Sequence, residues 1–333
     1  MALLAGIDEA GYGPHLGPLV VAAAALRFPG RDLPDPDLWP ALADHVHKRP
    51  GGAGGRAVVC DSKAAYTGGG AGLARLERTV LGFLAAGGVR PRSFADLLEA
   101  LSPGPAAHAG HADPEDRQPW HRPEDVPLPA AATADEVDAA AEHLAAGLAS
   151  IGASGGRLWV NTAPPARLNR LMNEGGRNKA QALFALNADL LVAVRGAEPD
   201  APVHVTVDRH GGRRYYGGLL AGAFPMDAVE VLGESPAESR YRLRPSGAGP
   251  DAAMDITVRD RCEAWSLVTA LASMAAKYVR ELDMGLLNAY FAARVPDLRP
   301  TAGYGRDAWR FLAEVAAARS ADGVPDAAIL RSR

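Results

Sequence analysis

Residues 6–14 read Gly6-Ile7-Asp8-Glu9-Ala10-Gly11-Tyr12-Gly13-Pro14, with apolar runs on either side at residues 2–7 and 19–26. This pattern predicts a hairpin of two buried strands over residues 2–27. Neighbouring side chains of a strand point to opposite faces, so Asp8 and Glu9 reach one point only where the strand bends or ends, which the glycines permit. Two such carboxylates form a candidate site for a hard cation. A surface hairpin with two solvated acids is the alternative.

The composition is that of an ordinary soluble globular protein. The chain has 333 residues, 48% of them hydrophobic and 22% charged, which is enough for one large domain or two smaller ones. The formal net charge of −4 excludes a global basic field, so a nucleic-acid partner would be held by local arginine clusters.

The number of cysteines and the hydropathy of the chain indicate the cellular compartment in which we expect the protein. The two cysteines, Cys60 and Cys262, are too few for a disulfide framework or a cysteine-based zinc site, and we expect free thiols. No run reaches the length of a membrane span, and no basic segment precedes an apolar stretch at the start of the chain. A cytoplasmic protein without a membrane partner is expected.

The order of elements predicts an α/β fold with a mixed central sheet flanked by helices. We expect a catalytic domain built from residues 1–63 and 157–333, with a large insertion at residues 64–156. Residues 103–133 are rich in Pro, His, Asp and Ala and have almost no large aliphatic side chain, so we expect a linker there. The expected strands lie at 56–60, 158–160, 203–207, 229–232, 240–244 and 255–258, and the expected helices at 71–86, 134–149, 166–194 (broken near 175), 261–291 and 308–318.

A third carboxylate follows the alternating, β-branched strand at residues 203–207. Asp208 lies at the C-terminal end of that strand, where open α/β sheets place their ligands. In the alternative reading, Asp208 only starts the turn into the loop with Gly211 and Gly212.

Several motifs carry a family resemblance. Asp8-Glu9-Ala10-Gly11-x-Gly13-Pro14-x-x-Gly17-Pro18-Leu19-Val20-Val21-Ala22-Ala23 resembles the first motif of type 2 ribonucleases H (ribonucleases HII and HIII), whose central position is usually Arg or Lys where this chain has Tyr12. The resemblance covers residues 5–27, 57–63 and roughly 166–312. It extends to Asp61-Ser62-Lys63, to the alanine-rich run that ends at Lys277 and Arg280, and to Gly303-Tyr304-Gly305. A histidine usually follows the last motif, and Trp309 takes its place here.

The resemblance implies a ribonuclease H-like fold and a fourth carboxylate. In the family's register the acidic ligand falls on Glu263, with Asp260 as the competing ligand if the register slips. An ordinary acid at a helix N-terminus is the alternative for Glu263. Asp8, Glu9, Asp208 and Glu263 would repel one another strongly without cations, and oxygen ligands alone favour Mg²⁺ or Mn²⁺. Two such ions suit hydrolysis of a phosphodiester.

The implied substrate is the RNA strand of an RNA–DNA hybrid or a single ribonucleotide in duplex DNA, cleaved to leave a 3′-hydroxyl. The first glycine motif would read the 2′-hydroxyl with backbone groups, Asp61-Ser62-Lys63 would contact phosphate, and Tyr304 would stack on a sugar. For Asp61 a helix N-cap is the alternative, and the two are compatible. The candidate substrate-binding residues are Gly11, Tyr12, Gly13, Asp61, Ser62, Lys63, Arg209, Lys277 and Tyr304.

Other polar groups have two interpretations each. Arg209, His210, Arg213 and Arg214, with Tyr215 and Tyr216 behind them, suit a phosphate backbone or form a solvated basic turn. His210 is also a candidate proton shuttle. Asn169, Asn173, Arg177, Asn178 and Lys179 form a solvated polar face or contact a nucleic-acid backbone.

Three functions therefore stay open. The first is an active metal-dependent type 2 ribonuclease H, which we expect to be a monomer. The second is a non-hydrolysing nucleic-acid-binding relative, and the third is another two-metal phosphodiesterase on the same fold.

Overall fold

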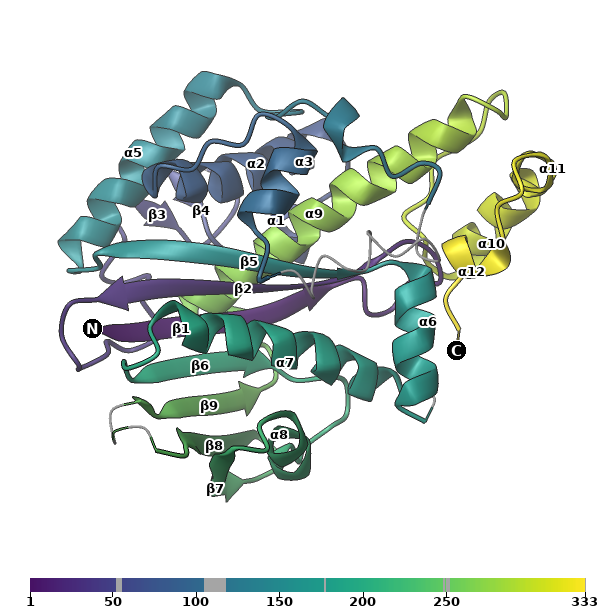
Figure 1. The fold of residues 1–333 in the computed structure, drawn as a ribbon. Helices are drawn as coiled ribbons and strands as arrows, with labels where there is room; N and C mark the ends of the chain where they lie inside the picture. Colours follow the sequence, from purple (N-terminus) through teal and green to yellow (C-terminus); the bar gives the residue numbers. More distant parts are fainter. Residues whose placement is uncertain (52–55, 105–117, 177, 248, 250–251, 333) are drawn as a thin grey trace.

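A seven-stranded mixed sheet forms the centre of the molecule, in a computed structural model that describes residues 1–51, 56–104, 118–176, 178–247, 249 and 252–332 (Figure 1). The strand order is β5-β2-β1-β6-β9-β8-β7, with β1, β6 and β9 parallel and the other neighbours antiparallel. The strands are β1 (Ala2–Ala10), β2 (Leu19–Phe28), β5 (Gly155–Ala163), β6 (Val203–Asp208), β7 (Asp227–Glu234), β8 (Glu238–Pro245) and β9 (Met254–Arg259). The expected α/β fold with a mixed central sheet is confirmed.

The predicted N-terminal hairpin is present and sets the position of the first two acids. β1 pairs with β2 along its whole length, from Ala2 opposite Phe28 to Ala10 opposite Val20. Its parallel pairing with β6 ends earlier, at Ile7 opposite Val207. The next residues, Asp8 and Glu9, therefore lie where β1 and β6 part, at the carboxyl edge of the two strands.

Helices cover both faces of the sheet (Figure 1). One face packs against α6 (Pro165–Glu174), α7 (Lys179–Ala197) and α8 (Gly217–Ala223). The other packs against α2 (Gly69–Ala86), α3 (Phe94–Ala100), α5 (Ala134–Ser150) and α9 (Leu267–Ala292). The helices of the expected insertion thus share one apolar core with the sheet and α9. The short elements on that side are β3 (Val46–His47), β4 (Ala57–Val58), α1 (Ser62–Ala65) and a 3₁₀ turn, η2 (Pro123–Asp125).

The alanine-rich helix α9 lies very close to the sheet. A Cβ atom at Gly6 would clash with the backbone nitrogen of Thr269, so β1 can approach α9 only without a side chain there. The hydroxyl of Thr206 forms buried hydrogen bonds with Ser266 and Thr269 across the same contact, at 2.9 and 2.6 Å. This packing fixes α9 against the ends of β1 and β6.

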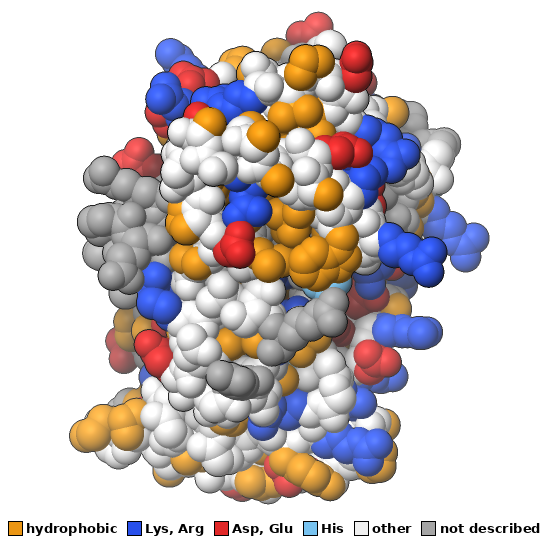
Figure 2. Space-filling model, turned by 90° about the vertical axis from the view of Figure 1, so that its right-hand side faces the viewer, with side chains coloured by type: hydrophobic (Ala, Val, Ile, Leu, Met, Phe, Trp, Pro, Cys, Tyr) orange, Lys and Arg blue, Asp and Glu red, His pale blue; other side chains and the backbone are white. Residues whose placement is uncertain are grey.

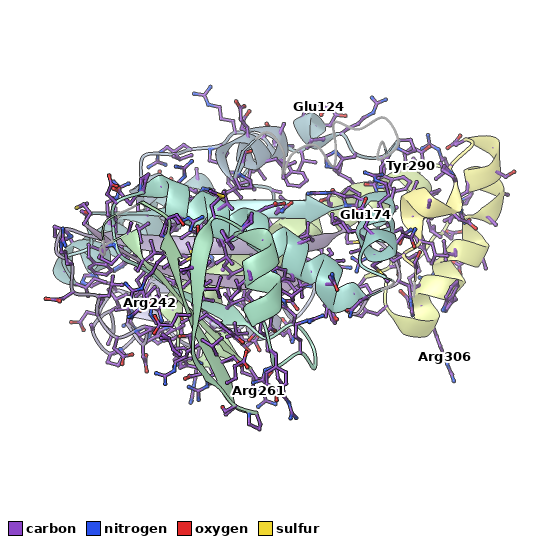
Figure 3. All side chains as sticks on the ribbon, turned by 60° about the horizontal axis from the view of Figure 1, so that its bottom comes forward. Glu124, Glu174, Arg242, Arg261, Tyr290 and Arg306 are labelled. Atoms are coloured by element: carbon purple, nitrogen blue, oxygen red, sulfur yellow. The ribbon has the colours of Figure 1, made fainter. Side chains whose placement is uncertain are left out.

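The helix expected from residue 261 starts later. Residues Cys262–Ala264 form a separate 3₁₀ turn, η4, and the α9 N-cap is Ser266, whose hydroxyl accepts from the amide of Thr269. Arg261, which precedes η4, has a left-handed backbone with φ of 57° and lies just beyond the carboxyl end of β9 (Figure 3). Trp265 and Ser266 lie between η4 and α9, and the extended backbone of Ser266, with φ of −118° and ψ of 111°, ends helical geometry there, so the two segments do not form one continuous helix.

Part of the expected linker is packed instead. Trp120 is 5% exposed and its ring lies 5.8 Å from that of Phe291. The buried carboxylate of Glu77 accepts from the amides of Ala130, Ala131 and Ala132. The burial of Trp120 and the hydrogen bonds of Glu77 hold residues 118–133 against the fold. The scarcity of large aliphatic side chains in this segment gave no sign of these contacts. Residues 105–117 of that segment lie outside the described residues, as does Arg177.

The end of the chain forms a small helical unit beside the last turns of α9. It contains α10 (Gly305–Glu314), α11 (Ala316–Ala321) and α12 (Asp326–Ile329), and Arg306 projects from it into solvent (Figure 3). Its apolar core includes Leu16, which follows the first glycine motif. The loop after β1 therefore packs against the C-terminal unit, whereas the N-terminus lies at the opposite side of the sheet (Figure 1).

The expectation that no segment could span a membrane needs one correction. By length and composition α7 is apolar enough to do so. Its buried residues, among them Leu183, Leu186 and Leu190, pack against the sheet, as in the core helix of a globular fold. The two cysteines are buried and free, as expected.

Candidate metal centre and nucleic-acid interface

Three of the four predicted carboxylates come together. One carboxylate oxygen from each of Asp8, Glu9 and Asp208 lies within 4.8 Å of the others. Asp8 and Glu9 come from β1 and Asp208 from the end of the parallel strand β6. Asp8 is buried, and the other two are half-buried. The arrangement is a compact acidic cluster, which we name the carboxylate cluster.

Burial and mutual repulsion make the charged forms of these acids costly. Burial, followed by the charges of Glu9 and Asp208, raises the pKa of Asp8 well above its usual range. Burial and the charge of Asp208 raise the pKa of Glu9 to about 8. Burial raises the pKa of Asp208 to about 6. A bound cation would relieve this repulsion and favour the ionised forms.

Two hydrogen bonds from backbone amides orient the cluster. Oδ1 of Asp8 accepts from the amide of Glu9 at 2.7 Å, and Oδ1 of Asp208 accepts from the amide of Cys262 at 3.0 Å. The hydroxyl of Ser273 on α9 lies beside Asp8 and lowers its pKa. Sequence reasoning missed Ser273, because a serine inside an alanine-rich helix has no motif of its own.

Glu263 lies beside the carboxylate cluster but is not one of its three members. It sits on η4, half-buried, and its charge raises the pKa values of Glu9 and Asp208. Asp260 likewise raises the pKa of Asp208. Both acids are thus close enough to act on the cluster electrostatically. Glu263 and Asp260 both remain candidates for a further metal ligand.

The donor set fits a hard divalent cation. The three converging side chains offer only carboxylate oxygens, which Mg²⁺ and Mn²⁺ prefer. Asp8, Glu9 and Asp208 would hold such an ion, with Glu263 or Asp260 next to it.

Lys63 lies next to the carboxylate cluster. Its side chain is exposed, and its charge lowers the pKa values of Glu9, Asp208 and Glu263. Asp61 is the N-cap of α1 and accepts from the amide of Lys63 at 2.9 Å. Ser62 is buried and its hydroxyl accepts from Ser273 at 2.9 Å. The cap and the buried serine thus fix the backbone that carries Lys63 beside the acids.

The first glycine motif and the late tyrosine motif also meet. A Cβ at Gly13 would lie 3.6 Å from Cε1 of Tyr304, so these two exposed residues are neighbours. Gly11 has a φ of +87°, and a side chain there would clash with Arg280. A glycine is therefore required at residue 11 both by the backbone and by the close approach of α9.

Comparison with known proteins gives a consistent likeness among solved structures. The chain is similar to type 2 ribonucleases H. Ribonuclease HII from Archaeoglobus fulgidus, solved as a complex with PCNA, is 15% identical, with 99% of this chain and 94% of that chain covered and a TM-score of 0.42. Ribonuclease H2 from Pyrococcus horikoshii OT3 is 13% identical over 98% and 92%, with a TM-score of 0.39. Bst-RNase HIII in complex with Mn²⁺ is 14% identical over 99% and 66%, with a TM-score of 0.41.

No family model matches the sequence, and no curated protein matches it.

Not all residues suggested by the type 2 ribonuclease H resemblance face the carboxylate cluster. The guanidinium of Arg209 donates to the carbonyls of Pro236 and Ala237, in the turn between β7 and β8. Lys277 is paired with Glu281 on its own helix. Both side chains are occupied by contacts within the protein.

His210 is not placed to shuttle protons. It is 1% exposed, among Phe184 and Tyr216, and burial lowers its pKa to about 3. A histidine that stays neutral in an apolar pocket cannot exchange protons near neutral pH. This suggestion from the sequence is wrong because Tyr216 and Phe184 close over the loop.

Proposed function

We propose that this protein is a divalent-metal-dependent endonuclease that hydrolyses the RNA strand of RNA–DNA hybrids, or single ribonucleotides in duplex DNA, leaving a 3′-hydroxyl. The observation that carries the proposal is the convergence of Asp8, Glu9 and Asp208 within 4.8 Å at the carboxyl edge of two parallel strands. Divalent ions held there would supply the Lewis-acid chemistry of phosphodiester hydrolysis.

The residues around the cluster support a polyanionic substrate. Lys63 provides a positive charge beside the acids, and Gly13 and Tyr304 form an exposed neighbouring surface. Figure 2 looks onto the side of the molecule toward which β1 and β6 run, and Lys and Arg side chains gather along its right-hand margin. Local positive charge of this kind attracts phosphates in a protein whose net charge is −4.

A cleavage assay on three duplexes tests the proposal. An RNA–DNA hybrid, a DNA duplex with one ribonucleotide and a plain DNA duplex are each incubated with Mg²⁺ or Mn²⁺ and, as a control, with a chelator. We expect metal-dependent cleavage of one or both ribonucleotide-containing duplexes. Binding without cleavage would indicate a non-hydrolysing relative, and cleavage of plain DNA would indicate another phosphodiesterase.

Variants connect the activity with the cluster. Asp208→Asn keeps the shape of the side chain but removes its charge, and we expect activity to fall by at least about a hundredfold. Asp135→Asn, an exposed residue of α5, is the matched control and should retain full activity. Equal activity in the two variants would exclude the cluster as the catalytic centre.

The further ligand is identified in the same way. Glu263→Gln and Asp260→Asn are compared by calorimetric titration with Mn²⁺ and by cleavage rate. The variant with weaker Mn²⁺ binding marks the residue that completes the site. If neither variant changes Mn²⁺ binding, the ion is held by Asp8, Glu9 and Asp208 alone.

A further inference from the structure

Two arginines from opposite parts of the sequence lie buried beneath the loop that follows the carboxylate cluster. Arg280 on α9 is 0% exposed and Arg331, near the end of the chain, is 3% exposed. The loop is residues 11–17, which runs from the first glycine motif toward β2. We name it the glycine loop.

Arg331 holds the backbone carbonyls of the glycine loop. Its Nε donates to the carbonyl of Gly17 at 2.6 Å, and its Nη1 donates to the carbonyls of Gly11 and Pro14. The amide of Arg331 also donates to the carbonyl of His15. One residue thus fixes four positions of a seven-residue loop.

Arg280 joins the glycine loop to the late tyrosine motif. Its Nη2 donates to the carbonyl of Ala302 at 3.0 Å and to that of Leu16 at 3.5 Å. Its guanidinium lies 5.6 Å from the ring centre of Tyr304. The contact between Gly13 and Tyr304 at the surface therefore rests on hydrogen bonds made by guanidinium groups below it.

Burying two guanidinium groups close together costs folding free energy. Burial lowers the pKa of Arg331 strongly, and the charge of Arg280 lowers it further, so the two cations repel each other. Among the residues that the structure describes, no carboxylate forms an ion pair with Arg331. Apolar side chains of similar volume commonly stabilise a fold at least as well as buried charges do. Costly buried charge is typical of places that hold a functional geometry.

We propose that Arg331, with Arg280, is a positioning residue for substrate: it turns the carbonyls of the glycine loop inward and so holds Gly13 beside Tyr304. These two exposed residues then form one surface for the sugar–phosphate backbone next to the carboxylate cluster. Arg331 acts through the loop and does not touch substrate or metal. The inference rests on the proposed function, because it assigns the surface to the same nucleic-acid site.

The test compares Arg331→Lys and Arg331→Ala with Arg294→Ala as a control. Lysine keeps the charge but cannot donate in the fork geometry of a guanidinium. Arg294 forms an ion pair with Asp322 at the far end of α9 and its side chain is 37% exposed, so its loss leaves the glycine loop intact. Affinity for an RNA–DNA hybrid is measured by fluorescence anisotropy without metal, and KM and kcat are measured with Mn²⁺.

For Arg331→Lys we expect a rise of about tenfold in KM and in the metal-free dissociation constant, since hydrogen bonds from a charged donor are lost. Calorimetric Mn²⁺ affinity should stay within about twofold, because the carboxylate cluster is not held by Arg331. Added guanidinium should partly restore hybrid binding in Arg331→Ala. Wild-type binding by a folded Arg331→Lys variant would overturn the proposal.

Hydrogen exchange tests the positioning role of Arg331 independently of the proposed function. The amides of residues 12–17 should exchange at least about tenfold faster in Arg331→Lys than in wild type or Arg294→Ala, with the sheet amides unchanged. Unchanged exchange in the glycine loop overturns the positioning role even if the wild type cleaves hybrids. If the wild type cleaves no ribonucleotide-containing duplex, the proposed function fails while the exchange result still decides whether Arg331 positions the loop.

Discussion

The ammonium group of Lys179 lies 4.9 Å from the centre of the Tyr12 ring. Tyr12 stands at the position where the family that the motif resembles usually has Arg or Lys, and Lys179, the first residue of α7, places an ammonium group against the Tyr12 ring. Tyr12 also packs against the apolar core, and its hydroxyl oxygen would lie 3.3 Å from a Cβ at Gly211. A positive charge thus remains beside the glycine motif, supplied from another element.

Lys179→Ala should weaken binding of an RNA–DNA hybrid in a salt-dependent way. If Lys179 contacts one phosphate, its removal reduces the slope of log affinity against log salt by about 1. Tyr12→Phe should leave this salt slope unchanged, because the ring face that holds the Lys179 ammonium is retained. Tyr12→Leu removes the ring and should reduce the slope. The matched control is Lys48→Ala, whose ammonium lies 4.0 Å from the Trp39 ring in the segment between β2 and β4. An unchanged slope in Lys179→Ala would remove Lys179 from the interface.

The carboxylate cluster predicts a pH dependence of stability. Burial and repulsion raise the pKa of Glu9 from 4.5 to about 8 and that of Asp208 from 3.8 to about 6. A carboxyl with a raised folded-state pKa stabilises the fold below its unfolded pKa, and that stability is lost as pH rises through the folded value. The metal-free protein should therefore lose stability, on the order of a few kcal/mol, between about pH 4 and pH 8.

Urea unfolding at several pH values, with a chelator or with Mn²⁺, checks this dependence. Mn²⁺ competes with the protons, so it should stabilise the protein most near pH 8 and flatten the pH profile. Asp208→Asn should reduce both the pH dependence and the Mn²⁺ effect. A metal-free profile that rises between pH 4 and pH 8 would contradict the electrostatic account of the cluster.

Glu77 should be among the buried positions of residues 64–156 where substitution destabilises the fold most. Its carboxylate accepts from three consecutive amides at 2.6–2.7 Å and from the hydroxyl of Tyr278 at 2.8 Å. Glu77→Gln places amide hydrogens against these donors and should lower the free energy of unfolding by about 2–4 kcal/mol. Tyr278→Phe removes one bond and should cost about 1 kcal/mol.

Urea unfolding measures both changes, with the exposed Glu142→Gln of α5 as the control. Limited proteolysis adds a local readout, because Glu77→Gln should expose residues 130–132 to cleavage. A loss of stability no larger than that of Tyr278→Phe would show that the three amide contacts contribute little.

His121 should give the fold a second pH-dependent contact. Its Nε2 lies 3.3 Å from Oδ1 of the buried Asp283. Burial alone would lower the pKa of His121, but the charge of Asp283, the hydrogen bond with Asp283 and the charge of Glu124 together outweigh burial and raise the pKa above 6.5. The stability from this pair is fully present below pH 6.5 and is lost as pH rises through the raised value.

The comparison of wild type with Asp283→Asn isolates the pair. The difference in unfolding free energy should be roughly 1–3 kcal/mol at about pH 6 and should shrink above pH 8. His47→Gln serves as a control outside the contact. A difference that is constant over this range would show that the charge on His121 does not contribute.

Local sequence patterns predicted the sheet and the acids at its edge. The hairpin, the break near residue 175, and Asp208 at the end of β6 all follow from apolar periodicity and glycine placement. These features depend on neighbours in the sequence, which is why patterns reveal them. Parallel strands then bring Asp208 to Asp8 and Glu9 without further information.

Contacts between distant residues could not be predicted in this way. Nothing near Arg331 indicates that its partners are Gly11 and Gly17, more than 300 residues earlier. The packing of Trp120 on Phe291 and the extended backbone of Ser266, which separates Glu263 from α9, are likewise features that local patterns did not show. The residues around Lys179 in the sequence are typical of a solvated polar face, and they do not indicate its contact with Tyr12, which lies in another part of the chain.

The distance in sequence between Gly11 and Arg331 has a consequence for synthesis of the protein. The two residues are 320 positions apart. A ribosome that adds ~5–20 residues per second needs ~16–64 s to cover that distance. During this time β1 and β2 can pair and the acids can gather, but the glycine-loop carbonyls that Arg331 holds have only water as a partner. A nascent or truncated chain that ends before residue 331 would therefore carry the carboxylates without a fixed surface to receive a duplex.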